Sequence, residues 1–305
     1  MKVAFQHSRI RAQDIADAQP VEEARERVLD RSIGDLIREA RRLTDEQIEQ
    51  ILLYQREHGV RFGEAAIALQ LATNDDVVWA LAQQFHYPYA PGEEVRNPEL
   101  VVAADPFSDE AEVFRELRSQ LLLGVMGPDE PRRAIAVLSP NIGDGKTYVV
   151  SNLAVAFSQL GGRTLLIDAD MRTPRQQDVF GIGPGRPGLS GILSGRAEQN
   201  VIQQVPELPS LFLLPAGAVP PNPLELVQRP AFGLLVHELL SKFEYVLVDT
   251  PAAEHGADAR VIAAKCGAAL VIGRKDRSRM DVMDRLLSGI SKTPAKVAGV
   301  VMNEH

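Results

Sequence analysis

The chain has 305 residues, of which 45% are hydrophobic and 24% are charged, a composition typical of a globular protein with a sizeable core. Asp and Glu outnumber Lys and Arg by 41 to 33, so the net charge is −8 and the chain lacks the basic excess of nucleic-acid-binding proteins. The single cysteine, Cys266, excludes an intramolecular disulfide, which suits the cytoplasm. No apolar run reaches the roughly 18 residues that a membrane-spanning helix needs. We therefore expect a cytoplasmic protein without a nucleic-acid partner.

Residues 28–90 contain an internal repeat. Residues 32–55 align with residues 61–84 at an offset of 29. The matched pairs include Gly34 with Gly63, Asp35 with Glu64, Thr44 with Thr73, Leu52 with Leu81, and Gln55 with Gln84. Thr44 and Gln47 stand where a helix cap and its reciprocal partner belong, as do Thr73 and Asp76 in the second copy. The pattern predicts a small helical domain of two similar units.

Two segments are expected to carry little regular structure. Residues 1–27 are polar and weakly periodic, which predicts a flexible start. Residues 91–108 contain proline and glycine and predict a linker. The second domain would then occupy residues 109–305.

The second domain begins with a predicted helix. From Asp109 onward, apolar residues recur at helical spacing. Glu112, Arg115 and Arg118 follow one another at intervals of three, so they lie near one face of that helix. A solvated face with local ion pairs is one interpretation of these charges, and a contact between subunits is the other.

Short apolar segments and helical segments alternate from about residue 132 to the end. The candidate strands are residues 134–139, 164–169, 211–217, 245–250, 268–273 and 297–303. Strands that are apolar along their whole length and are joined by helices favour a mostly parallel sheet covered on both faces, an α/β fold. Ligands of such sheets bind at the carboxyl ends of the strands.

The strongest motif is residues 139–147, Ser-Pro-Asn-Ile-Gly-Asp-Gly-Lys-Thr. It lies between a predicted buried strand and a predicted helix, as a phosphate-binding P-loop does. The glycines leave room for backbone N–H groups to face phosphate oxygens, and the helix N-terminus adds partial positive charge. Lys146 can reach the β- and γ-phosphates, and the Thr147 hydroxyl can bind magnesium. The candidate nucleotide-binding residues are Gly143, Asp144, Gly145, Lys146, Thr147 and Tyr148.

Acidic residues end two of the predicted strands. Asp168 ends the second strand and is followed by Asp170, and Asp249 ends the strand at residues 245–250. Carboxylates in this place can hold a magnesium–phosphate group or accept the proton of an attacking hydroxyl. A turn-forming aspartate is the alternative for any one of them.

These stretches resemble the motifs of a known family. SPNIGDGKT, LLIDADMR and VLVDTP are similar to the Walker A, A′ and B motifs of the bacterial tyrosine kinases, P-loop ATPases related to MinD and ParA. EVFRELR (residues 112–118) resembles their E-x-x-R-x-x-R motif, which joins subunits into a ring. LPAGAVPPNPLEL (residues 214–226) resembles another family segment. With the repeat attached, the whole chain resembles the EpsG-type chain-length-determinant kinases of exopolysaccharide loci.

The resemblance implies an ATP- and Mg²⁺-dependent enzyme that transfers phosphoryl groups to tyrosine. It implies Lys146, Asp168 and Asp170 as catalytic residues, Thr147, Asp168 and Asp249 at the metal, Asn303 at the adenine, and Glu112, Arg115 and Arg118 in a homo-oligomer. It also implies a role in exopolysaccharide synthesis or export and chain-length control. The expected partner is a membrane chain-length-determinant (polysaccharide co-polymerase) protein that would recruit the chain to the inner membrane.

Two departures from the family leave an alternative open. The MinD-type signature lysine would stand at Asn141, which disfavours a ParA-like partitioning ATPase. None of the five tyrosines follows Tyr245, whereas family members end in a tyrosine cluster that they phosphorylate. The alternative is a regulatory ATPase that binds or hydrolyses ATP and gates a membrane polysaccharide assembly without kinase activity.

The repeat resembles the N-terminal domain of type II secretion and type IV pilus ATPases, in which two such 24-residue motifs can bind cyclic di-GMP. The leading Arg-Leu-Gly of that family is Ser32-Ile33-Gly34 in the first unit and Arg61-Phe62-Gly63 in the second. Because one leading arginine is absent, a helical docking module is favoured over a cyclic di-GMP sensor.

A basic cluster follows the fifth candidate strand. It comprises Arg274, Lys275, Arg277 and Arg279. A solvated loop is the favoured interpretation, and contact with the nucleotide, a neighbouring subunit or a membrane partner is the alternative.

Overall fold

The structure is a computed structural model that describes residues 32–183, 185–196, 200–206 and 208–304, apart from residues 85–96. Its residues divide into two compact units at position 94/95. The flexible start expected for residues 1–27 lies outside the described residues, as do residues 91–96 of the expected linker. None of the helices in the described ranges is long and apolar enough to cross a membrane.

The first unit is the predicted helical repeat. Its helices are α2 (Ile33–Arg41), α3 (Asp45–His58), α4 (Phe62–Ala68) and α5 (Asn74–Gln84). The predicted caps are confirmed: Thr44 and Gln47 exchange reciprocal hydrogen bonds, and so do Thr73 and Asp76. These bonds satisfy backbone N–H groups that a helix start leaves unpaired.

Close packing explains why both copies keep a glycine. A Cβ on Gly63 would lie 2.7 Å from a methyl carbon of Val77, so α4 can approach α5 only without a side chain there. A Cβ on Gly34 would touch the Phe62 ring at 3.5 Å. The small core of this helical repeat contains Ile37, Ile51 and Ala65, all fully buried.

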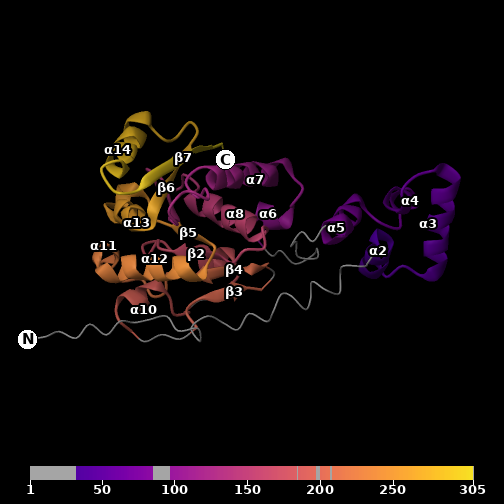
Figure 1. The fold of residues 1–305 in the computed structure, drawn as a ribbon, viewed down its shortest axis with the longest axis horizontal. Coiled ribbons are helices and arrows are strands. Elements are labelled where there is room, and N and C mark those ends of the chain that lie inside the picture. Colours follow the sequence, from indigo (N-terminus) through magenta and orange to yellow (C-terminus); the bar gives the residue numbers. More distant parts are fainter. Residues whose placement is uncertain (1–31, 85–96, 184, 197–199, 207, 305) are drawn as a thin grey trace, which may run out of the picture. The chain divides into compact units, whose positions relative to one another are not determined.

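The second unit is an α/β domain with a seven-stranded sheet in the order β3-β4-β2-β5-β1-β6-β7 (Figure 1). The strands are β1 (Ala134–Leu138), β2 (Thr164–Asp168), β3 (Gln203–Val205), β4 (Leu208–Leu214), β5 (Tyr245–Asp249), β6 (Gly267–Arg274) and β7 (Lys296–Asn303). All neighbouring pairs are parallel except β3 with β4. The predicted mostly parallel sheet is confirmed. The sequence pattern did not predict the edge strand β3, because this strand has only three residues and depends on its pairing with β4.

Helices cover both faces of this sheet (Figure 1). The first face packs against α6 (Val101–Ala104), α7 (Asp109–Leu123), α8 (Lys146–Ser158) and α9 (Gln176–Val179). The second packs against α10 (Leu189–Leu193), α11 (Pro223–Gln228), α12 (Pro230–Lys242), α13 (Asp258–Cys266) and α14 (Met280–Ile290), and the short helix η2 (Ala253–His255) precedes α13. Alternate strand residues enter the two cores: Ile135 and Val137 face α8, whereas Ala136 and Leu138 face the other layer. This burial on both sides explains the continuous apolar strands.

Residues 97–108 are not the linker that the sequence predicted. They contain α6, whose Val102 is fully buried in the core beside α8. Asn152 of α8 accepts the backbone N–H of Val102 at 3.1 Å and donates to the Glu99 carbonyl at 2.8 Å. The prolines suggested an irregular segment, but contacts with a distant helix stabilise it.

Val102→Ala tests this packing. Removing two buried methyl groups should lower the free energy of unfolding by about 1–3 kcal/mol. Val113→Ala is the control, because Val113 is 61% exposed on α7 and its loss should change stability by less than about 0.5 kcal/mol. Urea unfolding followed by circular dichroism measures both. Equal stability of the two variants would show that residues 97–108 do not pack on the domain.

Candidate nucleotide-binding site

The loop between β1 and α8 has the backbone of a phosphate cradle. Gly143 and Gly145 have positive φ angles of 78° and 95°, which favour glycine. A Cβ on Gly145 would lie 2.1 Å from the Asn303 amide nitrogen, so a side chain there would force Asn303 to move. Gly145 is also the N-cap of the 13-residue helix α8, which begins at Lys146. The loop therefore presents bare backbone at a helix N-terminus, the place where phosphates bind.

Lys146 and Thr147 open the helix. The Lys146 side chain is buried although it is charged. Thr147 Oγ1 donates to Asp249 Oδ2 over 2.9 Å. The two residues expected to contact phosphate and metal thus lie beside an acid from the middle of the sheet.

Asp168 and Asp249 lie side by side. They are paired residues at the carboxyl ends of the neighbouring strands β2 and β5, and both are buried. Burial raises the pKa of Asp249 to about 6, and the Lys146 ammonium group offsets part of the rise. Burial, followed by the charge of Asp249, raises the pKa of Asp168 well above its usual range. Two buried acids this close favour a cation between or beside them.

Asp170 has a different environment. Its Oδ1 accepts the backbone N–H groups of Arg172 and Thr173 at 3.1 and 3.0 Å, and its Oδ2 accepts the Thr173 hydroxyl at 3.0 Å. This is the pattern of an aspartate that holds a turn. The structure thus gives Asp170 the turn-forming role that the sequence left open as the alternative.

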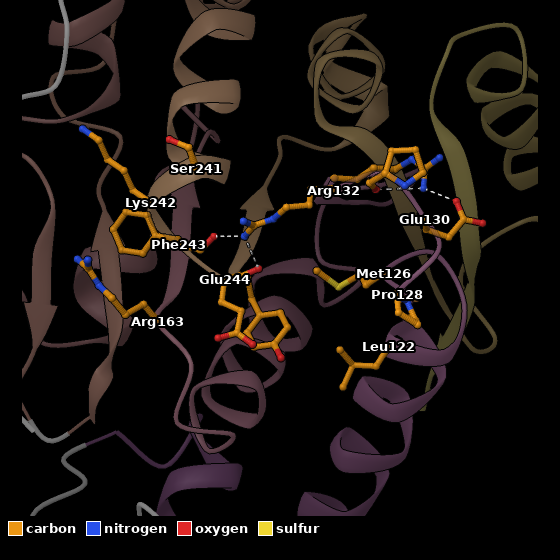
Figure 2. A pocket seen from close by; sticks show the side chains of 14 residues that line it. Leu122, Met126, Pro128, Glu130, Arg132, Arg163, Ser241, Lys242, Phe243 and Glu244 are labelled. Carbon is orange, nitrogen blue, oxygen red and sulfur yellow. Dashed lines mark hydrogen bonds and ion pairs between the residues drawn. The ribbon is translucent and has the colours of Figure 1, made fainter. Parts of the chain in front are cut away.

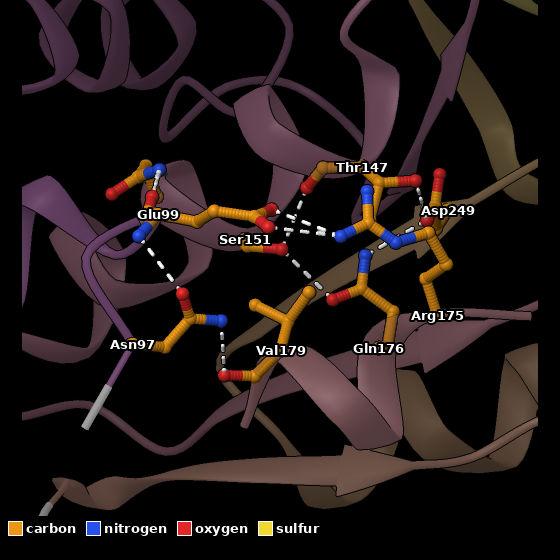
Figure 3. Close-up of polar contacts among 9 residues, drawn as sticks. Asn97, Glu99, Thr147, Ser151, Arg175, Gln176, Val179 and Asp249 are labelled. Atoms are coloured by element: carbon orange, nitrogen blue, oxygen red, sulfur yellow. Dashed lines mark hydrogen bonds and ion pairs between the residues drawn. The ribbon is translucent and has the colours of Figure 1, made fainter. Parts of the chain in front are cut away.

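Gln176 was missed by the sequence analysis. Its side chain is fully buried and donates to Asp249 Oδ2 at 2.8 Å (Figure 3). Its backbone N–H donates to Asp168 Oδ2 at 3.1 Å. A glutamine after a proline-containing loop carries no sequence signal for this position, because its side chain contacts Asp249, which is 73 residues away in the chain.

Comparison with known proteins identifies the family. Residues 135–305 match the CobQ/CobB/MinD/ParA nucleotide binding domain. The chain belongs to this family. Among its relatives is the tyrosine-protein kinase Wzc of Salmonella typhimurium, 32% identical over 208 residues, which are 68% of this chain and 28% of Wzc. Another is the tyrosine-protein kinase CpsD of Streptococcus agalactiae, 28% identical over 63% of this chain and 82% of CpsD.

The solved structures that resemble this chain also include a tyrosine kinase domain. The kinase domain of the Escherichia coli tyrosine kinase ETK superposes with a TM-score of 0.64 at 27% identity, over 70% of this chain and 82% of that domain. The resemblance to the bacterial tyrosine kinases is confirmed. Because the chain spans only 28% of the length of Wzc, the properties of that whole protein do not transfer directly.

The side chains beside the P-loop are of the kind that binds a magnesium–nucleotide. The described residues contain no cluster of three or more His, Cys, Asp or Glu side chains arranged to hold a metal ion. Magnesium commonly takes one or two protein ligands together with phosphate oxygens and water. Thr147 and Asp249 fit that pattern, and Asp249 Oδ1 is a buried oxygen without a hydrogen-bond partner among the described residues.

The basic cluster is divided between the P-loop and the surface. Arg274 Nη1 donates to the Gly143 carbonyl at 3.0 Å, and the Arg277 guanidinium lies 3.0 Å from where a Gly143 Cβ would be. Lys275 forms an exposed ion pair with Glu304. Arg274 therefore borders the P-loop, whereas Lys275, Arg277 and Arg279 are exposed, as the solvated-loop interpretation expects.

Asn303 also borders the P-loop. Its amide nitrogen lies 3.2 Å from the Asp144 carbonyl, at the end of β7. Asp144 itself is fully buried, and its Oδ2 accepts the Asn141 backbone N–H at 2.8 Å, so it shapes the loop from inside.

Helix α7 contacts the P-loop helix through several polar groups. The Tyr148 hydroxyl donates to the Glu110 carboxylate, and burial together with that bond raises the pKa of Tyr148. Arg118 Nη1 donates to the Ala156 carbonyl at 2.6 Å. Arg115 pairs with Glu112 at 2.7 Å and donates to the Pro106 carbonyl. The predicted subunit-contact residues thus also stabilise the domain itself.

A cavity of about 620 Å³ is not the nucleotide site. Its lining includes Arg132, Arg163 and Tyr245 (Figure 2). These residues lie at or just before the amino ends of β1, β2 and β5, whereas the P-loop follows the carboxyl end of β1. The P-loop and this cavity therefore lie at opposite ends of the strands.

Asp249→Asn tests the cost of burying this acid. A folded-state pKa of about 6, above the unfolded value of about 3.9, means that the folded protein binds more protons across this window and loses stability as pH rises from about 4 to about 6. Asn can still accept from Thr147 without a charge. The variant should therefore be more stable than the wild type by about 3 kcal/mol at pH 7.5, with little difference below pH 4.

Urea unfolding with a chelator and without nucleotide measures this difference at each pH. A variant that is less stable than the wild type at pH 7.5 would show that attraction by Lys146 exceeds the cost of burial.

Proposed function

We propose that the chain binds Mg-ATP and transfers the γ-phosphoryl group to tyrosine hydroxyls. The single observation that carries this proposal is the Thr147–Asp249 hydrogen bond of 2.9 Å. It joins the start of the P-loop helix to the acid at the end of β5, beside Asp168. The relatives named as tyrosine-protein kinases support the choice of tyrosine as acceptor.

The chain's own residues would act mainly by position and charge. The backbone N–H groups of the P-loop and the Lys146 ammonium group would bind the β- and γ-phosphates. Thr147 and Asp249 would hold magnesium, which when bound supplies positive charge to the phosphate oxygens. Asn303, beside the P-loop, would contact the adenine, a role supported by its place next to Gly145. The buried site keeps these charges away from water, which strengthens their interaction.

Asp168 is the proposed acceptor of the tyrosine proton. Its pKa is raised by burial and by Asp249, and an acceptor is most effective when its pKa lies near the working pH. Asp170 would support Asp168 through its backbone N–H, which donates to Asp168 Oδ1 at 3.1 Å.

One observation favours the second candidate, a regulatory ATPase without kinase activity. Asp168 is fully buried, and each of its oxygens already accepts a backbone N–H, from Asp170 and Gln176. A carboxylate held in this way serves a metal–water shell more readily than a protein tyrosine that arrives from outside.

We also propose the setting in which the chain acts. Its resemblance to exopolysaccharide kinases and its match to Wzc and CpsD support a role in polysaccharide synthesis or export with chain-length control. The proposed partner is a membrane co-polymerase that recruits the chain to the inner membrane. Binding of cyclic di-GMP by residues 28–90 stays the less favoured alternative, because Ser32 stands where that family has a leading arginine, and a docking role is proposed instead.

Phosphotyrosine mapping decides between kinase and ATPase. The full chain is incubated with Mg-ATP and a tyrosine-containing peptide, phosphotyrosine is mapped by mass spectrometry, and ADP release is recorded. Lys146→Ala should lower both signals by about 100-fold or more, because it removes a buried charge from the phosphate site. Lys292→Ala, at an exposed lysine, should change neither. ADP release without phosphotyrosine would establish the regulatory ATPase and reject the kinase.

Light scattering tests the proposed homo-oligomer. Glu112→Ala combined with Arg115→Ala should lower the mass of the full chain in solution, because the two charges would pair with a neighbouring subunit. Arg118 is kept, since it stabilises α8 through the Ala156 carbonyl. Glu116→Ala is the control on the same helix. An unchanged mass in the double variant would reject α7 as the contact.

A further inference from the structure

Gln176 is a neutral polar side chain with no exposed surface. A buried amide without partners would destabilise the fold by several kcal/mol, so its hydrogen bonds account for its presence. It is the first residue of α9, a helix of four residues that leaves the sheet after β2. Its backbone carbonyl accepts the Phe180 N–H at the end of α9, whereas its side chain bonds to α8 and to the end of β5.

Three bonds connect Gln176 to three different elements, and Figure 3 shows the two that its side chain makes, with Asp249 and Ser151. Its backbone N–H donates to Asp168 Oδ2 at the end of β2. Its Nε2 donates to Asp249 Oδ2 at the end of β5 over 2.8 Å. Its Oε1 accepts the Ser151 hydroxyl of α8 over 2.8 Å. Gln176 thus links both acids of the site to the P-loop helix.

The chemistry of the partners fixes the direction of this amide. An ionised carboxylate can only accept, so the NH₂ group must face Asp249 and the carbonyl must face Ser151. The Ser151 hydroxyl lies 2.6 Å from the Thr147 carbonyl as well. Because that second acceptor belongs to α8 itself, Ser151 stays satisfied when Gln176 is changed.

The amide also fixes the orientation of Asp249. Its Oδ2 accepts from both Thr147 and Gln176, at 2.9 and 2.8 Å. Oδ1 is left buried and without a hydrogen-bond partner among the described residues. With one oxygen held by two donors, rotation of the carboxylate would break both bonds, so Oδ1 is the oxygen presented to a ligand.

We infer that Gln176 is a positioning residue that holds Asp249 in the orientation needed to bind the magnesium of a magnesium–nucleotide. This inference rests on the proposed function, since it concerns the same site. Groups that orient a metal-binding carboxylate typically change metal affinity by about 10- to 100-fold. A purely structural role, in which Gln176 only ties α9 to the sheet, predicts loss of stability without any dependence on magnesium.

Nucleotide binding measured with and without magnesium separates the two roles. Gln176→Met preserves most of the side-chain volume but cannot form hydrogen bonds. In the full chain, a fluorescent ATP analogue is titrated at fixed magnesium concentrations and again in EDTA. The Mg²⁺ concentration for half-maximal binding should rise by about 10-fold, while affinity in EDTA stays within about twofold of the wild type.

Two further variants complete the experiment. Gln177→Ala, on the next residue of α9, should match the wild type in both conditions because it touches neither acid. Gln176→Asn keeps the amide but is one methylene shorter, so it should behave as Gln176→Met even if methionine disturbs packing. Circular dichroism confirms that each variant is folded.

The possible outcomes have distinct meanings. A loss specific to magnesium in both Gln176 variants supports the inference. An equal loss with and without magnesium, or no loss, overturns it in favour of the structural role while the wild type still binds nucleotide. Absence of nucleotide binding by the wild type would overturn the proposed function, and the inference with it.

Discussion

Two aspartates, Asp168 and Asp249, lie side by side at the carboxyl ends of β2 and β5, and both are buried away from water. Moving such charges out of water is costly, and the rise in the pKa of Asp249 to about 6 reflects that cost. The surrounding structure reduces it with the buried Lys146 and with donors from α8 and α9. The local architecture is therefore organised to keep two like charges together, as a site that receives a cation requires.

This arrangement depends on the two cores of the sheet. Because β1, β2 and β5 alternate between the α8 side and the α12 side, neither their register nor their direction can shift without exposing apolar residues. The fixed register sets Asp168 opposite Asp249 and directs both toward the P-loop. Residues 97–108 add to the same support, since α6 packs on α8 and Asn152 joins the two segments. The packing of helices on both faces of the sheet thus stabilises the domain and also sets the geometry of its site.

The P-loop keeps its structure where the sequence departs from the family motifs. Asn141 stands where MinD-type proteins have lysine, and it closes the loop on the buried Asp144. Arg274 and Arg277 approach the same loop from the other side. The cations near the P-loop therefore come from the end of β6 and the loop after it as well as from Lys146.

The sequence by itself determined every strand of the described sheet except β3, the P-loop, the acids at the strand ends and the helical repeat, because each depends on local periodicity or on a spacing within a short segment. It also placed the caps at Thr44 and Thr73, since capping needs only residues three positions apart. Tertiary structure alone decided that residues 97–108 belong to the domain, that Asp170 holds a turn, and that Arg274 borders the P-loop. It alone brought Gln176 to Asp249, because a bond across 73 residues depends on how β2, β5 and α9 meet and leaves no pattern in the chain.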